Sequence, residues 1–546
     1  MTDDRFPGSA QSPRPFRWVG AWSERRAALS PDRTALVDRT TGREFTYADL
    51  DARANRAARL LSDRGVGRGD RVAVVSRNRP ALVDLFFATA KVGAVLAPLS
   101  HRLAPPELVE MLNGIEPSLL VVEAPFDDLA RAVLEAEDAA FDAPVVSLST
   151  GEADGEWPAY GETLPGDDSP VETPDLSPAD PHLFLHTGGS TGTPKEVVVP
   201  HGAVVWNSLN TITAWGIRED DVTPLLFPMF HTGGWNVITV PVFHMGGTVV
   251  LARAFDPGEI LRTVERRAAT VLVAVPAQLR MMVEHDDWAA TDLSTLRVAK
   301  SGGGPARQQI MEAWWDRGVN LSQGYGLTEI GPNNFEMPDD WPREKADSVG
   351  VPAPHVDARV VDEDGTELGA GEVGELELAG LHAGAGYWRN EEETAATFGG
   401  DSASEGGGSS TGGTPSGGWV STGDLARRDE AGYYYIEGRK KNMYVSGGEN
   451  VYPPEVEDEI ADHPAVAEVV VVAVPDEQWG QVGKAVVEPA AGAAEDDLTI
   501  EELRSFLDDR LARFKQPRHL AFVEELPTSG PSKIDRQAVE ERFGGG

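Results

Sequence analysis

A glycine-rich stretch between two short apolar runs is the feature that most constrains this chain. It reads TGGSTGTPK over 187–195 and lies between Leu183-Phe184-Leu185 and Val197-Val198-Val199. Apolar runs on either side of clustered glycines predict two strands joined by a glycine-rich loop. Glycine lets backbone N–H groups approach an anion closely, and hydroxyl groups add further donors. The stretch therefore predicts a loop that binds a polyphosphate.

Two alternatives remain open for this stretch. Its spacing does not fit the Walker A pattern Gly-x-x-x-x-Gly-Lys-Ser/Thr. The letters GGSTG over 188–192 do match the Gly-x-Ser-x-Gly elbow of serine hydrolases, with Ser190 as the nucleophile. An elbow leads directly into a helix, whereas Pro194 and the β-branched run after it disfavour one. A glycine-rich turn without a ligand is the other alternative.

Length and composition predict a globular protein of more than one domain. The chain has 546 residues, of which 41% are hydrophobic, so it can bury large cores. No apolar run reaches the roughly 18 residues of a membrane helix. The first residues lack the apolar core of a signal peptide, and we expect a cytoplasmic protein without integral membrane association.

The absence of cysteine excludes several kinds of site. With no cysteines in the sequence, disulfides, thiolate nucleophiles and cysteine-ligated zinc are ruled out. No His-Glu-x-x-His motif is present either. Any metal is therefore expected to be Mg²⁺, held by carboxylate and phosphate oxygens.

The formal charge of −40 limits the partners. Such a chain repels nucleic acid and anionic membranes, and it binds an ATP-like anion only where cations gather locally. Most of its 48 basic residues are arginines, so each lysine in a motif is notable. Strong acidity with few lysines predicts a halophilic protein whose self-repulsion is screened by salt.

Helical and strand patterns alternate along the first half of the chain, which predicts layered α/β sheets. Thr46 is the expected N-cap of a helix that ends at Asp63, before Gly65. The other expected elements are strands over 71–75, 94–97 and 270–275 and helices over 79–92 and 260–267.

Two further segments and one separate unit stand out. Residues 150–180 are expected to form a surface connection, and the low-complexity segment 399–418 a flexible insertion. From about residue 440 the pattern predicts a small α+β domain. Its expected elements are helices over 453–462 and 500–514 and strands over 469–474, 484–487 and 519–523.

Several short motifs add chemistry to the glycine-rich loop. His231 lies between an aromatic residue and glycines, in PMFHTGG. The glycines of SGGGP, 301–305, permit close approach to a flat ligand. In QGYGLTE, 323–329, glycines expose Tyr325 for stacking on a base, and the hydroxyl and carboxylate beyond it suit Mg²⁺ on a phosphate. Taken singly, each motif also fits a structural turn.

Three more motifs lie near the C-terminus. Asp424 in STGD is expected to end a strand with a carboxylate suited to paired ribose hydroxyls. A basic island, GRKKN over 438–442, interrupts the acidic chain and precedes the loop Gly447–Gly448. Lys533 stands alone on a turn that contains glycine and proline. A solvated charge run is the alternative interpretation of the basic island.

Together and in this order, these motifs resemble the acyl-adenylate-forming superfamily, which includes acyl-CoA synthetases, peptide-synthetase adenylation domains and firefly luciferase. The resemblance runs from about residue 20 to 540 and is strongest to acyl- and aryl-CoA ligases, through MYVSGGENVYPPEVE and FPMFHTGGW. It implies an α/β fold with a large N-terminal domain, 1–438, of layered β-α-β subdomains plus a small β-barrel. A smaller mobile α+β domain, 439–546, would cap it, with the hinge at Lys441.

The resemblance implies an AMP-forming ligase that uses ATP, Mg²⁺ and coenzyme A. A fatty or aryl carboxylate attacks the α-phosphorus of ATP, and the CoA thiol then takes the acyl group from acyl-AMP. Catalytic roles fall on Lys533, Glu329, Thr328 and His231, with Glu329 also the metal ligand and His231 and Trp235 at the acyl pocket. The nucleotide and CoA would contact Thr187, Gly188, Gly189, Ser190, Thr191, Gly192, Lys195, Gly303, Gly304, Pro305, Tyr325, Asp424, Arg439, Gly447 and Gly448.

The sequence departs from the family pattern at three of these motifs. Glu196 stands where glycine commonly follows Pro-Lys, and it puts a like charge near the phosphates. Asn442 replaces a frequent aspartate, and Ser532 replaces the glycine before the lysine. A ligase that loads a carrier protein is the alternative within the family, and a hydrolase built on Ser190 the alternative outside it. The identity of the acid and the oligomeric state, a homo-oligomer included, are not readable from the sequence.

Overall fold

The computed structural model describes residues 18–148, 157–187, 195–399, 418–446, 449–476, 479–490, 492–493, 498–508, 510–528 and 534–544. The predicted flexible insertion, 399–418, therefore lies almost wholly outside the described residues. Within the described ranges, no helix combines the length and the apolar character needed to cross a bilayer.

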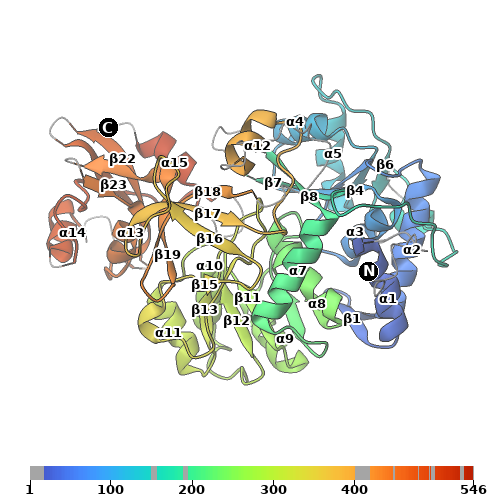
Figure 1. Cartoon of the computed structure of the whole chain (residues 1–546), viewed down its shortest axis with the longest axis horizontal. Helices are drawn as coiled ribbons and strands as arrows, with labels where there is room; N and C mark the ends of the chain where they lie inside the picture. The colour runs from blue at the N-terminus through green and yellow to red at the C-terminus, as the bar shows by residue number, and fades with distance from the viewer. Residues whose placement is uncertain are drawn as a thin grey trace, which may run out of the picture.

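The N-terminal half is built on two sheets (Figure 1). The first has the order β6-β5-β3-β4-β7-β8, in which only β8 runs antiparallel to its neighbour. Its strands are β3 (Arg71–Val75), β4 (Val95–Leu99), β5 (Leu119–Val122), β6 (Val145–Ser147), β7 (Pro181–Thr187) and β8 (Lys195–Pro200). The second, β2-β1-β10-β9, contains β1 (Thr34–Asp38), β2 (Arg43–Thr46), β9 (Val222–Leu225) and β10 (Thr248–Leu251).

Helices that follow the predicted apolar stripes flank these sheets. Thr46 caps α2 as expected: its side chain accepts a hydrogen bond from the N–H of Asp49, and the Asp49 carboxylate in turn accepts one from the N–H of Thr46. The helices up to residue 267 are α1 (Ala21–Leu29), α2 (Tyr47–Asp63), α3 (Pro80–Val92), α4 (Pro105–Ile115), α5 (Asp127–Leu134), α6 (Tyr160–Thr163), α7 (His201–Trp215), α8 (Thr239–Met245) and α9 (Pro257–Arg267). The alternation of helices and strands predicted for this half is confirmed.

The 150–180 connection is more than a surface loop. Its described part carries α6 and buries Tyr160 and Leu176, which are 5% and 4% exposed. The polar composition of the segment gave no sign of this burial, because a few apolar side chains are enough to pack a mostly polar loop against the core.

A third, parallel sheet and an antiparallel one complete the large domain. The parallel sheet joins β11 (Val271–Ala274), β12 (Val298–Ser301) and β13 (Leu321–Gln323), with α10 (Pro276–Val283) and α11 (Gln308–Asp316). The antiparallel sheet β16-β17-β18-β19 stands where the resemblance implies a small barrel. It contains β16 (Asp357–Val361), β17 (Val373–Ala379), β18 (Val420–Arg428) and β19 (Tyr434–Arg439), near the short pair β14 (Phe335–Glu336) and β15 (Val351–Pro352) and helix α12 (Glu391–Phe398).

The C-terminal part forms a separate sheet at one end of the molecule (Figure 1). Its strands are β20 (Tyr444–Ser446), β21 (Glu449–Val451), β22 (Val466–Asp476), β23 (Gly480–Pro489) and β24 (His519–Phe522), with α13 (Pro453–Ala461), α14 (Ile500–Leu507) and α15 (Arg536–Phe543). The helix predicted over 500–514 is wrong in length, because α14 ends at Leu507. Beyond it, the side-chain amide of Gln516 donates to the Leu511 carbonyl, which replaces a helical partner.

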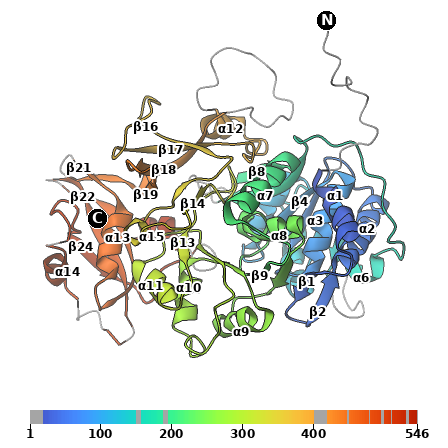
Figure 2. The same cartoon turned by 60° about the horizontal axis from the view of Figure 1, so that its bottom comes forward.

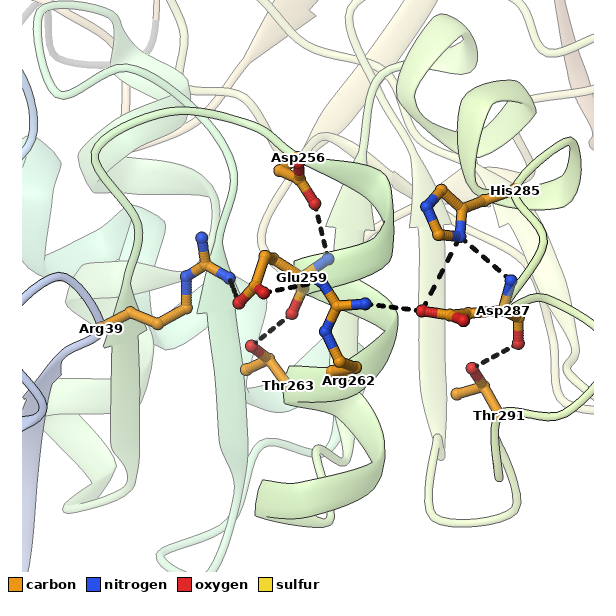
Figure 3. Close-up of polar contacts among 8 residues, drawn as sticks. All are labelled: Arg39, Asp256, Glu259, Arg262, Thr263, His285, Asp287 and Thr291. Carbon is orange, nitrogen blue, oxygen red and sulfur yellow. Dashed lines mark hydrogen bonds and ion pairs between the residues drawn. The ribbon is translucent and has the colours of Figure 1, made fainter.

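A chain of ion pairs ties the second sheet to the third across the surface (Figure 3). Arg39 contacts Glu259 of α9 at 2.6 Å, and Glu259 in turn contacts Arg262 at 2.6 Å. Arg262 continues the chain to Asp287, again at 2.6 Å. These side chains remain partly exposed, so each ion pair contributes only about 0–1 kcal/mol to stability.

Candidate nucleotide and acyl site

The ends of the glycine-rich loop are fixed opposite each other. Thr187 is the last residue of β7, Lys195 is the first of β8, and the two are partners in the antiparallel ladder. The loop residues Gly188, Gly189, Ser190, Thr191 and Gly192 lie outside the described residues. The two strands predicted on either side of the loop are confirmed. The chain after the loop enters a strand, so the helix that a hydrolase elbow needs does not follow it.

Lys195 is held by a carboxylate on α12. Its Nζ lies 2.8 Å from Oε2 of Glu393, and its side chain is only 12% exposed. The same Nζ lies 5.5 Å from the centre of the Tyr387 ring, within range of a cation–π contact. One of the few lysines in the chain is therefore held at the end of the glycine-rich loop by Glu393 and Tyr387.

Glu196 does not share the surroundings of Lys195. Successive strand residues point to opposite faces, so Glu196 lies on the other face of β8 from Lys195. Burial, together with the charge of Glu110 on α4, raises the pKa of Glu196 to about 7. The negative charge expected beside Lys195 is therefore weakened, and it lies on the opposite face of β8.

Glu329 meets Tyr387 at the other side of the loop. The Tyr387 hydroxyl donates to Oε1 of Glu329 at 2.9 Å, and the N–H of Gly384 donates to the Glu329 carbonyl. Thr328 lies half-buried beside it in the loop after β13. Burial raises the pKa of Tyr387, as does the nearby charge of Glu329, so its hydroxyl stays a donor.

The carboxylate of this site would suit a Mg²⁺ ion that is bound together with a nucleotide. Among the residues that the structure describes, no group of three acidic or histidine side chains could cage a metal. Mg²⁺ keeps several waters and is commonly held by one or two carboxylates plus substrate phosphates. One oriented carboxylate, Glu329, meets that need.

Two loops suited to a flat base lie side by side. β12 and β13 are parallel neighbours with Ser301 opposite Gln323, so the loops 302–305 and 324–329 leave the same edge of the sheet. Gly303 has φ +80°, a left-handed conformation that favours glycine, and Gly304 and Pro305 are exposed beside it. The exposed glycines leave room beside this edge of the sheet for a flat base.

Asp424, Arg439 and Tyr325 form one polar cluster. Asp424 is 5% exposed; its Oδ1 lies 2.8 Å from Arg439 Nε, and its Oδ2 accepts from the Tyr325 hydroxyl at 2.5 Å. Asp424 and Arg439 are cross-strand partners of β18 and β19. A carboxylate can accept several hydrogen bonds, and hydroxyl groups are among the donors that suit it.

The expectation that Asp424 ends a strand is wrong. β18 continues to Arg428, and the register shifts just beyond Asp424, between Leu425 and Ala426. Gly423 before it has φ +69°. A left-handed glycine and a bulge re-aim a side chain without ending the strand, which the motif alone could not distinguish from a strand end.

His231 and Trp235 have different surroundings. His231 is half-buried, with its ring 4.5 Å from that of Phe230 and 5.9 Å from that of His186. Trp235 lies in the π-helical turn Gly233–Val237, fully buried and stacked on Phe86 at 4.7 Å. His231 is therefore the member of the pair that reaches the surface in this structure.

The basic island lies between the two parts of the molecule. Lys441 is exposed in the short helix Lys440–Asn442, which connects β19 to β20, and Lys440 pairs with Glu375 at 2.8 Å. A turn between two sheets is where a hinge would be placed, and that role stays a prediction. Gly447, Gly448 and Lys533 lie outside the described residues.

Cross-domain ion pairs fix the C-terminal sheet against the third sheet. Glu468 of β22 pairs with Arg307 at 2.9 Å and with Arg280 of α10 at 3.4 Å. Nearby, burial and then the charges of Glu457 and Asp347 raise the pKa of Asp458 to about 7. The ion pairs attract the two domains to each other, while the neighbouring carboxylates repel one another.

Sequence reasoning missed Tyr387, Glu393 and His186. His186 directly precedes the glycine-rich loop, and burial lowers its pKa to about 4. Tyr387 follows the glycines of AGAGY, a spacing like that of the other motifs, which could have indicated it. Glu393 gave no signal, because it is one of three consecutive glutamates and only folding selects it.

Comparison with known proteins decides the family. The AMP-binding enzyme family matches residues 23–388, and the AMP-binding enzyme C-terminal domain matches residues 455–533. The chain belongs to the AMP-binding enzyme family. It has the adenylate-forming fold, a large N-terminal α/β domain with a smaller C-terminal domain, as the resemblance implied.

Relatives within the family are acid–CoA ligases. The chain is 35% identical to a feruloyl-CoA synthase of Amycolatopsis, over 96% of this chain and 99% of that one. It is 36% identical to an indoleacetate–CoA ligase of Aromatoleum aromaticum, over 96% and 98%. The ATP-bound crystal structure of MatB from Rhodopseudomonas palustris superposes with a TM-score of 0.84 at 30% identity, over 96% and 99%. This chain is likewise a carboxylate–CoA ligase that proceeds through an acyl-adenylate and forms a thioester.

Proposed function

We propose that the acid activated by this ligase is a planar aromatic carboxylic acid. The observation that carries the proposal is the group of rings around His231. The centre of the Phe230 ring lies 5.6 Å from that of His101 and 6.2 Å from that of His186. His231 lies beside Phe230. Such rings favour stacking on a flat acid over wrapping an alkyl chain. The names of the feruloyl and indoleacetate relatives point the same way.

A panel of acids tests this choice. ATP–pyrophosphate exchange would be measured with ferulate, indoleacetate, 2-succinylbenzoate and octanoate, each with and without CoA. We expect kcat/KM for the aromatic acids to exceed that for octanoate by at least about tenfold, since binding differences of 1–3 kcal/mol are usual for such pockets. Preference for octanoate would reject the aromatic assignment and favour the fatty-acid metabolism that the resemblance left open.

We assign the nucleotide to the edge shared by the loops described above. Asp424 and Arg439 would hold the ribose, Tyr325 and the glycines 303–304 the adenine, and Thr187 and Lys195 the β- and γ-phosphates. Glu329 and Thr328 would hold the Mg²⁺ and a phosphate. Joining two anions requires positioning and charge neutralisation, and these groups supply both.

Lys533 is proposed to bridge the carboxylate and the α-phosphate during adenylation only. Lys533→Ala should then reduce acyl-AMP formation by orders of magnitude and leave thioester formation from supplied acyl-AMP near wild type. Both half-reactions would be measured separately. Equal loss in the two, or loss in neither, would reject this role.

An arginine patch favours free CoA over a carrier protein as acyl acceptor. The Arg102 guanidinium lies 6.0 Å from the Phe230 ring and that of Arg77 lies 5.5 Å from the Phe126 ring. Arg79 and Arg253 contact the buried Glu123 beside them. Burial, and after it the charge of Arg77, lowers the pKa of Arg102. CoA carries three phosphates, whereas pantetheine on a carrier protein carries one.

Dephospho-CoA tests the arginine patch. Arg102→Ala should raise KM for CoA and have less effect on KM for dephospho-CoA or pantetheine. A matched loss with all three acceptors, or efficient transfer to a carrier protein instead of CoA, would favour the carrier-loading alternative.

Three broader features stay proposals. We propose adaptation to high salt from the charge of −40. A cytoplasmic location is proposed from the sequence, and a homo-oligomer stays a prediction that no feature of the composition carries. None of these three proposals depends on which carboxylic acid the ligase activates.

A further inference from the structure

One tyrosine contacts both of the charged groups proposed to hold the triphosphate. The Tyr387 hydroxyl donates to Glu329 at 2.9 Å, and its ring lies beside Nζ of Lys195 at 5.5 Å. These two residues come from separate motifs, one at the start of β8 and one after β13. Tyr387 is the described side chain that joins them.

The backbone around Tyr387 is fixed by both neighbours. Gly386 accepts from the N–H of Val198 in β8 at 2.9 Å, and Val197 and Tyr387 are bridge partners. On the other side, the N–H of Tyr387 donates to Thr394 Oγ1 of α12 at 2.9 Å. A Cβ on Gly386, which has φ +121°, would lie 2.5 Å from the Thr394 methyl. The ring therefore projects from a segment with little freedom to shift.

The hydroxyl constrains the carboxylate in a way that suits a metal. A carboxylate bound to one donor through Oε1 keeps a defined rotamer and acceptor positions for a cation. Ligating carboxylates in metal sites are commonly oriented by such hydrogen bonds. The ring meanwhile presents its electron-rich face to the ammonium, which limits where Lys195 can lie.

We propose that Tyr387 is a positioning residue of the nucleotide site: its hydroxyl orients Glu329 toward the Mg²⁺ of the incoming nucleotide, and its ring holds Lys195 toward the phosphates. The inference rests on the proposed roles of Glu329 and Lys195. It adds a residue that touches neither the acid nor the reacting phosphorus.

The test is equilibrium binding of ATP to the full chain in the absence of acid, so that no turnover occurs. Calorimetric titrations would be repeated over a series of Mg²⁺ concentrations for wild type and Tyr387→Phe, which removes only the hydroxyl. We expect the Mg²⁺ concentration for half-maximal ATP affinity to rise about tenfold, the usual order for loss of a hydrogen bond to a charged group. Affinity for AMP, which lacks the β- and γ-phosphates, should stay unchanged.

Two variants separate the hydroxyl, the ring and general destabilisation. Tyr387→Leu also removes the ring, so ATP affinity at saturating Mg²⁺ should fall below that of Tyr387→Phe. Tyr434→Phe is the matched control, because the hydroxyl of Tyr434 donates to the Ala358 carbonyl in β16, away from the loop. It should leave the Mg²⁺ dependence at the wild-type value.

The outcomes are distinct. An unchanged Mg²⁺ dependence in Tyr387→Phe overturns the proposal, as does an equal loss of AMP and ATP affinity, which would indicate a structural role. Wild type that binds AMP but gains no ATP affinity from Mg²⁺ would overturn the proposed role of Glu329 itself, and the inference with it.

Discussion

At the scale of single residues, the site depends on a few charges whose partners are already in place. Asp424 carries two such partners, Arg439 and Tyr325, on its two oxygens. A buried carboxylate held by two such partners is rigid, which suits it to bind hydroxyl groups. Its replacement affects the partners as well as the ligand.

Asp424→Ala is expected to weaken binding of both AMP and ATP by roughly 10- to 100-fold, because hydrogen bonds to charged groups contribute about 1.5–3 kcal/mol. Calorimetric titration with AMP measures this directly. Tyr325→Phe removes one partner only and should have a smaller effect. Unaltered AMP affinity in Asp424→Ala would contradict the ribose assignment.

Buried histidines make the stability of the fold sensitive to acid. The rings of His182 and His201 stack at 4.7 Å, and both are 0% exposed. Burial lowers the pKa of His201 from 6.5 to about 4 and that of His182 well below its usual range. The folded state keeps these rings neutral, whereas the unfolded chain takes up protons below about pH 6.5.

The free energy of unfolding should therefore be highest above pH 6.5 and fall as the pH drops toward 4, by up to about 1.4 kcal/mol per pH unit for each such histidine. Urea unfolding at pH 7, 6 and 5 measures the slope. His201→Phe should make the slope shallower, and the same change at the exposed His519 should not. Equal slopes in all three proteins would refute the assignment.

At the scale of elements, strand register and one short helix assemble the site. Registers place Thr187 opposite Lys195 and Asp424 opposite Arg439. Helix α12 packs beside β18 (Figure 2) and brings Glu393 to Lys195. Asn390 caps this helix by accepting from the N–H of Glu393, which fixes the first turn and hence the carboxylate.

Glu393→Gln is expected to tighten ATP binding several-fold, since it removes a carboxylate that competes with phosphate for Lys195 and repels it. Glu392→Gln is the matched control, with the same charge change on an exposed neighbour in α12. Both would be compared by ATP titration at fixed Mg²⁺. Weaker ATP binding in Glu393→Gln would show instead that Glu393 supports the lysine in the complex.

At the scale of the whole molecule, net charge and domain contact act together. With a net charge of −40, the acidic side chains repel one another across the molecule. The ion pairs of Glu468 between the two domains lie near further carboxylates such as Asp458. Surface pairs such as Arg39–Glu259 weaken in salt, but screening also removes the larger net repulsion (Figure 3).

We therefore expect Tm to rise by several degrees between 0.1 and 3 M KCl, because the Debye length falls from about 10 Å at 0.1 M to about 3 Å at 1 M. Thermal unfolding and ligase activity across this range measure it. Sucrose at matched viscosity controls for general solvent effects. Full stability and activity at 0.1 M KCl would reject adaptation to salt.

The sequence by itself determined the family, the layered α/β architecture, and the motifs. Periodicity and capping residues located α2 and β3 well, because both signals are local. It misjudged the end of α14 and the place of Asp424 in β18. A strand bulge beyond Asp424 re-aims the chain there, and the motif does not encode a bulge. Tertiary structure alone decided that Tyr387 and Glu393 meet the lysine of the glycine-rich loop. Contacts between residues so far apart depend on strand pairing and packing, which local patterns do not encode.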